Sequence, residues 1–161
     1  MAKQKLAKTN AVRLLDRKKI AYNLMEYTIE DNRLDGVTVA QKVGHPASHV
    51  FKTLVTTAGA GKFFVFVIPV AEELNLKACA KAAGEKKIEM LHVKDLLATT
   101  GYIRGGCSPV GMKKLFPTFI DESAKNLEYI LVSAGKIGMQ IQLNPSDLIK
   151  VTQGKFASLT I

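Results

Sequence analysis

Lys52 is the residue whose surroundings in the sequence fit its charge least well. It lies in an apolar, β-branched run from His49 to Val55, and in a strand its side chain points the same way as those of Val50 and Leu54. A lysine in such a run either covers apolar surface with its aliphatic stem or holds its ammonium group in a pocket. The strand pattern alone leaves both interpretations open.

Two glycine-rich segments are the other candidates for ligand contact. Residues 105–111 include three glycines, a proline and small polar side chains, a composition that lets the backbone approach a ligand closely. Residues 133–138 have a similar composition. Because tight turns need the same residue types, each segment is equally open to a purely structural explanation.

The motifs of several common enzyme classes are missing. The sequence holds no Walker loop and no dinucleotide-binding glycine motif, and Ser108 lacks the flanking glycines of a hydrolase nucleophile. His45 and His49 have the spacing of a helical metal pair, but Pro46 between them argues against that helix. Cys107 has no evident basic partner, which favours a buried or loop thiol over a nucleophile. We therefore expect no metal and no other cofactor.

Length and composition predict one soluble domain spanning residues 1–161. We expect no membrane association, since no apolar run reaches the roughly 18 residues of a membrane span. No signal peptide is evident, and two cysteines in such a chain are expected to be reduced, so we expect a cytoplasmic protein. The net charge of +9 favours an anionic partner, with nucleic acid the leading candidate and a solvated basic surface the alternative.

Short helices and strands alternate irregularly, and hairpins outnumber possible parallel crossovers. Capping residues and turn residues predict helices that start near residues 10, 38, 76, 93 and 145, and strands within 20–27, 49–58, 62–70, 87–91, 119–120, 129–133, 139–143 and 156–161. We therefore predict an α+β fold with a mixed, barrel-like sheet of six or seven strands surrounded by helices.

Three motifs in a fixed order make the chain resemble the YbaK/EbsC family of bacterial trans-editing aminoacyl-tRNA deacylases. The resemblance covers residues 9–161 and is far more specific than any one glycine loop. The motifs are Phe51-Lys52-Thr53-Leu54, then Gly105-Gly106-x-Ser108-Pro109-x-Gly111, then Val132-Ser133-x-Gly135-Lys136-x-Gly138.

This resemblance implies a fold similar to the editing insertion domain of bacterial prolyl-tRNA synthetase. It also implies an activity, the hydrolytic removal of mischarged cysteine from tRNA(Pro), with the acceptor end of that tRNA as ligand and prolyl-tRNA synthetase as an expected partner. Attack by the substrate's own thiol, releasing a thiolactone, would need no nucleophile from the protein.

The resemblance also implies roles for individual residues. Lys52 matches the lysine regarded as essential, and its expected role is to position the substrate by charge. Tyr27, Gly105 and Ser133 match pocket positions that orient the substrate. The neighbouring residues Thr53 and Gly106 are expected to line the same pocket.

Other functions stay open from the sequence. The chain could deacylate Ala-tRNA(Pro) or another mischarged tRNA, and no single residue decides between cysteine and alanine. A noncatalytic module that binds tRNA or a synthetase would explain the charge without Lys52. A small-molecule hydrolase would explain a pocket without the charge.

Overall fold

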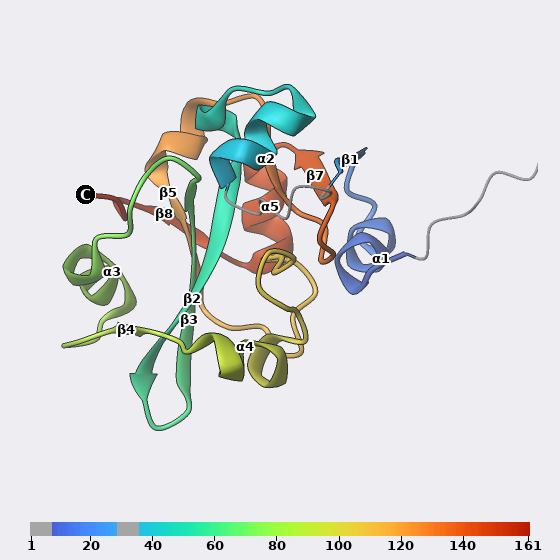
Figure 1. The fold of residues 1–161 in the computed structure, drawn as a ribbon. Helices are drawn as coiled ribbons and strands as arrows, with labels where there is room; N and C mark the ends of the chain where they lie inside the picture. The colour runs from blue at the N-terminus through green and yellow to red at the C-terminus, as the bar shows by residue number, and fades with distance from the viewer. Residues whose placement is uncertain (1–7, 29–35) are drawn as a thin grey trace, which may run out of the picture.

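The computed structural model describes residues 8–28 and 36–161, whose strands form two sheets (Figure 1). The larger sheet has the strand order β4-β2-β3-β5-β8, and the smaller sheet has the order β1-β7-β6. The strands are β1 (Asn23–Glu26), β2 (Phe51–Gly59), β3 (Lys62–Pro69), β4 (Glu89–Met90), β5 (Thr118–Asp121), β6 (Ile130–Ser133), β7 (Met139–Leu143) and β8 (Lys155–Ala157). The helices are α1 (Asn10–Arg17), α2 (Gly36–Val43), α3 (Leu76–Ala83), α4 (Val93–Thr100) and α5 (Pro145–Thr152), with short 3-10 helices η1 (Ala47–His49) and η2 (Glu122–Asn126).

Both faces of the five-stranded sheet are buried, which explains why β3 is apolar nearly throughout. One face packs against α1, α5 and the smaller sheet, in a core that includes Phe51, Leu15 and Ile141. The opposite face packs against α3 through Phe66 and Cys79. Because side chains alternate along a strand, neighbouring residues of β2 contribute to different cores.

One edge of β2 is covered by other strands only at its two ends. β2 pairs with β3 along the opposite edge, whereas β4 pairs only with Thr56 and Thr57. Just before β2, Val50 forms an isolated parallel bridge with Leu131 of β6. In the described part of the chain, residues 51–55 therefore have no paired strand on this edge.

The two glycine-rich segments pack against each other around Tyr102. The Tyr102 hydroxyl donates to the carbonyl oxygen of Val110 at 2.7 Å. A Cβ atom added at Gly135, where φ is +94°, would lie 2.7 Å from the Tyr102 ring, and one at Gly111 would lie 2.9 Å from the backbone of Ala11. Gly111 and Gly135 are therefore required for packing, because a larger residue at either position would clash with its neighbours.

The predicted α+β fold is confirmed, and the helices begin and end close to the expected residues. Side chains cap the first turns at Thr9, Asn75 and Asn144, and α3 and α4 end at the left-handed glycines Gly84 and Gly101. The strands differ from one barrel-like sheet of six or seven, because eight strands form two sheets that do not close. Only the bridge between Val50 and Leu131 links a strand of one sheet to the other within the described residues.

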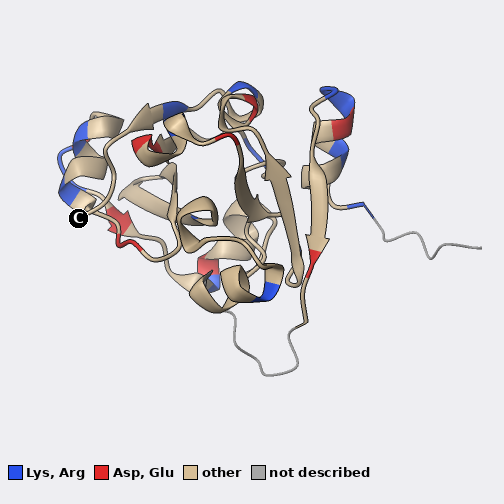
Figure 2. Cartoon of the chain, turned by 90° about the horizontal axis from the view of Figure 1, so that it is seen from above, with Lys and Arg blue, Asp and Glu red and all other residues tan. Residues whose placement is uncertain are grey.

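Among the described residues, the lysine and arginine positions are spread over several elements of the backbone in Figure 2. They lie on helices at both ends of the molecule, including α1 and α3 (Figure 2). Within residues 8–28 and 36–161, no helix has the length and apolar character needed to cross a membrane.

The contact between Gly135 and Tyr102 predicts a specific loss of stability. Gly135→Ala forces a Cβ atom into the tyrosine ring in addition to the left-handed backbone penalty of about 1–2 kcal/mol. Gly84→Ala is the matched control, since Gly84 also has positive φ but a Cβ atom added there would have no neighbour within 4 Å. Urea unfolding is expected to show the larger loss for Gly135→Ala, and equal losses would contradict the packing described here.

Candidate functional site

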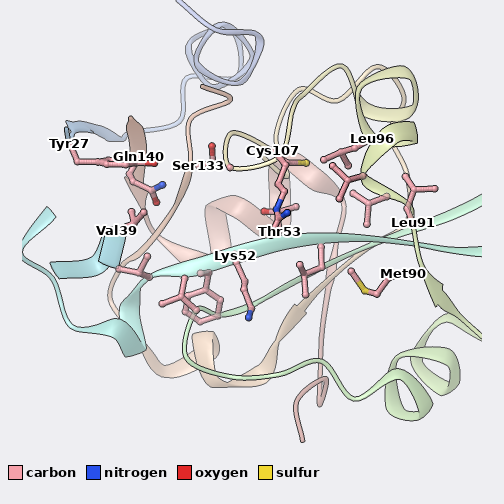
Figure 3. Close-up of a pocket in the computed structure, with 18 residues that line it drawn as sticks. Tyr27, Val39, Lys52, Thr53, Met90, Leu91, Leu96, Cys107, Ser133 and Gln140 are labelled. Carbon is pink, nitrogen blue, oxygen red and sulfur yellow. The ribbon is translucent and has the colours of Figure 1, made fainter. Parts of the chain in front are cut away.

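A cavity of about 480 Å³ lies at the uncovered edge of β2 (Figure 3). This volume is in the usual range for small-ligand pockets. Segments far apart in the sequence contribute to its wall, and they come from both sheets. The lining residues are Tyr27, Val39, Val50, Phe51, Lys52, Thr53, Leu54, Val55, Val70, Met90, Leu91, Val93, Leu96, Arg104, Gly105, Cys107, Ser133 and Gln140.

The backbone of β2 directs hydrogen-bonding groups toward this edge, where they have no strand partner among residues 8–28 and 36–161. The Val70 N–H donates to the Val50 carbonyl at 2.9 Å, so these two residues form a hydrogen-bonded pair across the antiparallel strands. Such pairs alternate along a ladder, which turns the N–H and C=O of Thr53 away from β3. The Leu91 N–H, which donates to the Val55 carbonyl at 3.0 Å, agrees with this alternation. Thr53 therefore offers one backbone donor and one backbone acceptor at the open edge.

Lys52 and Thr53 leave β2 on opposite sides, and Thr53 is on the side of Ser133 and Cys107 (Figure 3). Both residues nevertheless line the cavity. The Lys52 side chain is half-buried, and within the described residues it has no hydrogen-bond or ion-pair partner. Its ammonium group is thus available to an anionic or carbonyl group of a ligand.

The smaller sheet supplies the wall opposite β2. Ser133, at the end of β6, pairs with Gln140 of β7, and its hydroxyl accepts a hydrogen bond from the Gly135 N–H at 3.1 Å. Tyr27 directly follows β1, and its N–H donates to the Gly138 carbonyl at 2.9 Å. The second glycine-rich segment, 133–138, therefore fixes Tyr27 and Ser133 next to the same cavity.

The first glycine-rich segment divides into residues with different surroundings. Gly105 has φ of +85°, is exposed and lines the cavity. Gly106 does not line the cavity, and a Cβ atom there would meet the backbone of Lys136 and Ile137 at 3.0–3.2 Å. The structure therefore gives Gly106 a packing role between the two segments.

The cavity includes residues that the sequence did not single out as a site. Arg104, next to Gly105, adds a second cation to the lining. Gln140 is 6% exposed and contributes a buried amide. Arg104 could have been found from the sequence, because it directly precedes the glycine pair Gly105-Gly106. Gln140 could not, because Gln140 and Gln142 alternate on β7 as polar residues of a solvated face do.

Cys107 and Ser133, two lining residues, lack the character of an activated nucleophile. Burial raises the pKa of the Cys107 thiol to about 12, which leaves the thiol protonated at neutral pH. The Ser133 hydroxyl contacts a backbone N–H and not a base. In the described residues no three His, Cys, Asp or Glu side chains are grouped to hold a metal ion. The site can bind, orient and polarise a substrate, which suits a reaction whose nucleophile comes from the substrate or from water.

Comparison with known proteins supports an editing role. A family model described as "Aminoacyl-tRNA editing domain" matches residues 34–151. An Enterococcus faecalis (strain ATCC 700802 / V583) protein named "Putative Cys-tRNA(Pro)/Cys-tRNA(Cys) deacylase EbsC" is 50% identical over 161 residues, covering 99% of this chain and 98% of that protein. A "Proline--tRNA ligase" of Shouchella clausii (strain KSM-K16) is 26% identical over 117 residues, 72% of this chain but 20% of the ligase.

A solved structure has the same fold. It is described as the "Crystal structure of a putative trans-editing enzyme for prolyl tRNA synthetase" and superposes with a TM-score of 0.81 at 19% identity. The match covers 97% of this chain and 99% of the other.

The fold and cavity define a small α+β domain with a cavity at a sheet edge. The chain belongs to the aminoacyl-tRNA editing domain family, and the resemblance inferred from its three motifs is confirmed.

The raised thiol pKa values predict that neither cysteine reacts readily in the folded protein. Burial raises the pKa of both Cys79 and Cys107 to about 12, so only about one thiol in ten thousand is ionised at pH 8. Iodoacetamide at pH 8 is expected to label both residues only after unfolding, as measured by intact mass. Rapid labelling of native protein that disappears in Cys107→Ala would contradict a protonated Cys107.

Proposed function

We propose that this chain is a trans-editing deacylase that removes cysteine from mischarged tRNA(Pro). The family membership and the deacylase name of the relative at 50% identity support this proposal. The observation that carries it is the convergence of Tyr27, Lys52, Thr53, Gly105 and Ser133 on one cavity from four separate segments. The resemblance matches Tyr27, Lys52, Gly105 and Ser133 to pocket positions of the family, and Thr53 is the neighbour of Lys52.

The proposed chemistry relies on positioning. The substrate thiol loses its proton and attacks its own ester carbonyl. The bond to the ribose oxygen then breaks, this oxygen takes up a proton to become a hydroxyl, and a thiolactone leaves, so the protein forms no covalent bond. Effective molarities in well-oriented intramolecular reactions correspond to about 7–11 kcal/mol of barrier. Lys52, with no partner in the described residues, holds the 3′-terminal nucleotide or the ester by charge.

Editing of this kind is needed because a synthetase distinguishes amino acids of similar size poorly. A synthetic site shaped for proline cannot strongly exclude cysteine or alanine, because small differences in apolar volume discriminate by only about 10–200-fold. A second site that hydrolyses the wrong ester restores accuracy.

We further propose that residues 1–161 act as one editing domain and that prolyl-tRNA synthetase supplies tRNA identity. The core supports a single unit, since Ala11 and Leu15 of α1 are buried together with Leu148 of α5. Spread basic residues favour contact with the tRNA backbone without reading its sequence. The substrate also implies a cytoplasmic site of action.

Removal of the Lys52 ammonium group tests the proposed activity. Lys52→Ala is expected to reduce single-turnover deacylation of Cys-tRNA(Pro) by about 100-fold or more, because misplaced reacting groups lose that much rate. The matched control is Lys62→Ala on the same hairpin, where an exposed lysine pairs with Glu85 at 3.6 Å and does not line the cavity.

The same assay distinguishes the competing functions. Full activity in Lys52→Ala would contradict the positioning role. Binding of tRNA that weakens with salt, without any turnover, would indicate a noncatalytic module. Faster turnover of Ala-tRNA(Pro) than of Cys-tRNA(Pro) would make alanine the substrate, and turnover of free esters regardless of tRNA would indicate a general hydrolase.

The proposed dependence on a synthetase predicts weak tRNA selectivity for the isolated chain. Cys-tRNA(Pro) and Cys-tRNA(Cys) are expected to be deacylated at rates within about tenfold of each other, since phosphate contacts carry no sequence information. Adding prolyl-tRNA synthetase is expected to protect Cys-tRNA(Cys) relative to Cys-tRNA(Pro). Strong selectivity without the synthetase would show that this chain reads tRNA identity itself.

A further inference from the structure

Two buried polar atoms in the wall of the cavity lack hydrogen-bond partners. They are the Thr53 hydroxyl oxygen and the Gln140 side-chain oxygen, and no other buried side-chain nitrogen or oxygen of the described residues is without a partner. Both residues line the cavity. An unsatisfied buried polar group costs about 1–3 kcal/mol, so native proteins rarely keep one without a functional reason.

Neither group can readily turn to solvent. Gln140 lies in the middle strand of the smaller sheet, paired with Met25 on one side and Ser133 on the other, and it is almost fully buried. Thr53 is fixed in β2 and projects to the side of Ser133 and Cys107 (Figure 3). Both side chains therefore stay in the cavity wall, with oxygens that no donor of the described residues satisfies.

The charged residues of the cavity lining restrict which group of a ligand can bind to the Thr53 and Gln140 oxygens. The two charged lining residues are the cations Lys52 and Arg104, and none of the described lining residues carries a carboxylate. Phosphate and carbonyl oxygens of an aminoacyl-tRNA are thus drawn to the cations. A donor group needs acceptors, and the Ser133 hydroxyl already accepts from the Gly135 N–H.

We propose that Gln140 and Thr53 bind the α-amino group of the aminoacyl ester. This inference rests on the proposed function for the identity of the ligand. The α-amino group is the hydrogen-bond donor that every aminoacyl ester carries next to its carbonyl, and the open-edge carbonyl of Thr53 supplies a further acceptor at the same place. No donor among the described residues occupies the Gln140 side-chain oxygen, so its capacity to accept a hydrogen bond is unused.

The proposed contact defines a specificity. An ester whose α-nitrogen is acylated, such as a peptidyl-tRNA, has lost donors and gained bulk at this point, so the site rejects it. The editing domain would thereby spare growing peptide chains while it attacks free aminoacyl-tRNA. Removal of the α-amino group from the ligand should cost affinity that depends on Gln140.

A binding cycle tests this proposal without requiring turnover. The probes are stable amides of 3′-amino-3′-deoxyadenosine that carry either cysteine or 3-mercaptopropionic acid, which lacks only the amino group. Calorimetry with the wild type is expected to show at least about tenfold tighter binding of the cysteinyl amide, the usual size for a hydrogen bond to a charged group. Gln140→Leu should bind the two amides equally while retaining the affinity for the desamino amide.

Gln142→Leu is the matched control, since Gln142 lies two residues along β7 and does not line the cavity. It should keep the wild-type preference for the amino group. Thermal unfolding gives a second readout, because Gln140→Leu removes an unsatisfied buried oxygen and is expected to leave the melting temperature unchanged or raise it.

Two results would overturn the proposal. One is equal binding of the two amides by the wild type, and the other is a preference for the amino group that survives in Gln140→Leu. Either result can occur in a protein that deacylates Cys-tRNA(Pro) normally. Conversely, an amino preference lost in Gln140→Leu but without any deacylation would support the amino site and reject the proposed activity.

Discussion

The uncovered stretch of β2 is the constraint on which the site depends. β6 forms only a single bridge, with Val50 just before β2, and β4 pairs only with Thr56 and Thr57. In the described chain, residues 51–55 are therefore a strand edge with no paired strand. An open edge normally invites pairing with another strand. Here the cavity lies at this edge, and residues of both sheets line it. The open edge that separates this fold from a closed barrel therefore borders the candidate site.

This edge brings two kinds of group to one ligand. Alternation along β2 places Lys52 and Thr53 on opposite sides, so a cation and a buried polar group reach the cavity around a single strand (Figure 3). The backbone groups of Thr53 lie between them at the edge. With Cys107 protonated and without a base beside Ser133, these groups favour catalysis by orientation over catalysis by a protein nucleophile. A substrate that carries its own thiol suits such a site.

The sequence predicted local features well because they depend on neighbouring residues. The cap at Asn75, the stop at Gly84 and the hairpin that contains Lys52 all follow from short-range rules. The division into two sheets could not be predicted, since it depends on a long-range bridge and on how few residues β4 contributes. For the site, ordered motifs indicated positions that do line one cavity, but Gln140 escaped notice because an alternating glutamine looks the same on a solvated face and on a buried one.

Binding of the substrate's aminoacyl end at the open edge of β2 is the step on which the proposed activity depends. The most direct measurement is an amide NMR titration of the protein with the stable cysteinyl amide of 3′-amino-3′-deoxyadenosine. We predict that the largest shifts occur at the backbone N–H of Thr53 and at the side-chain amide of Gln140, since both face the cavity. Saturable binding that shifts other residues and leaves these two signals unchanged would contradict binding at this edge.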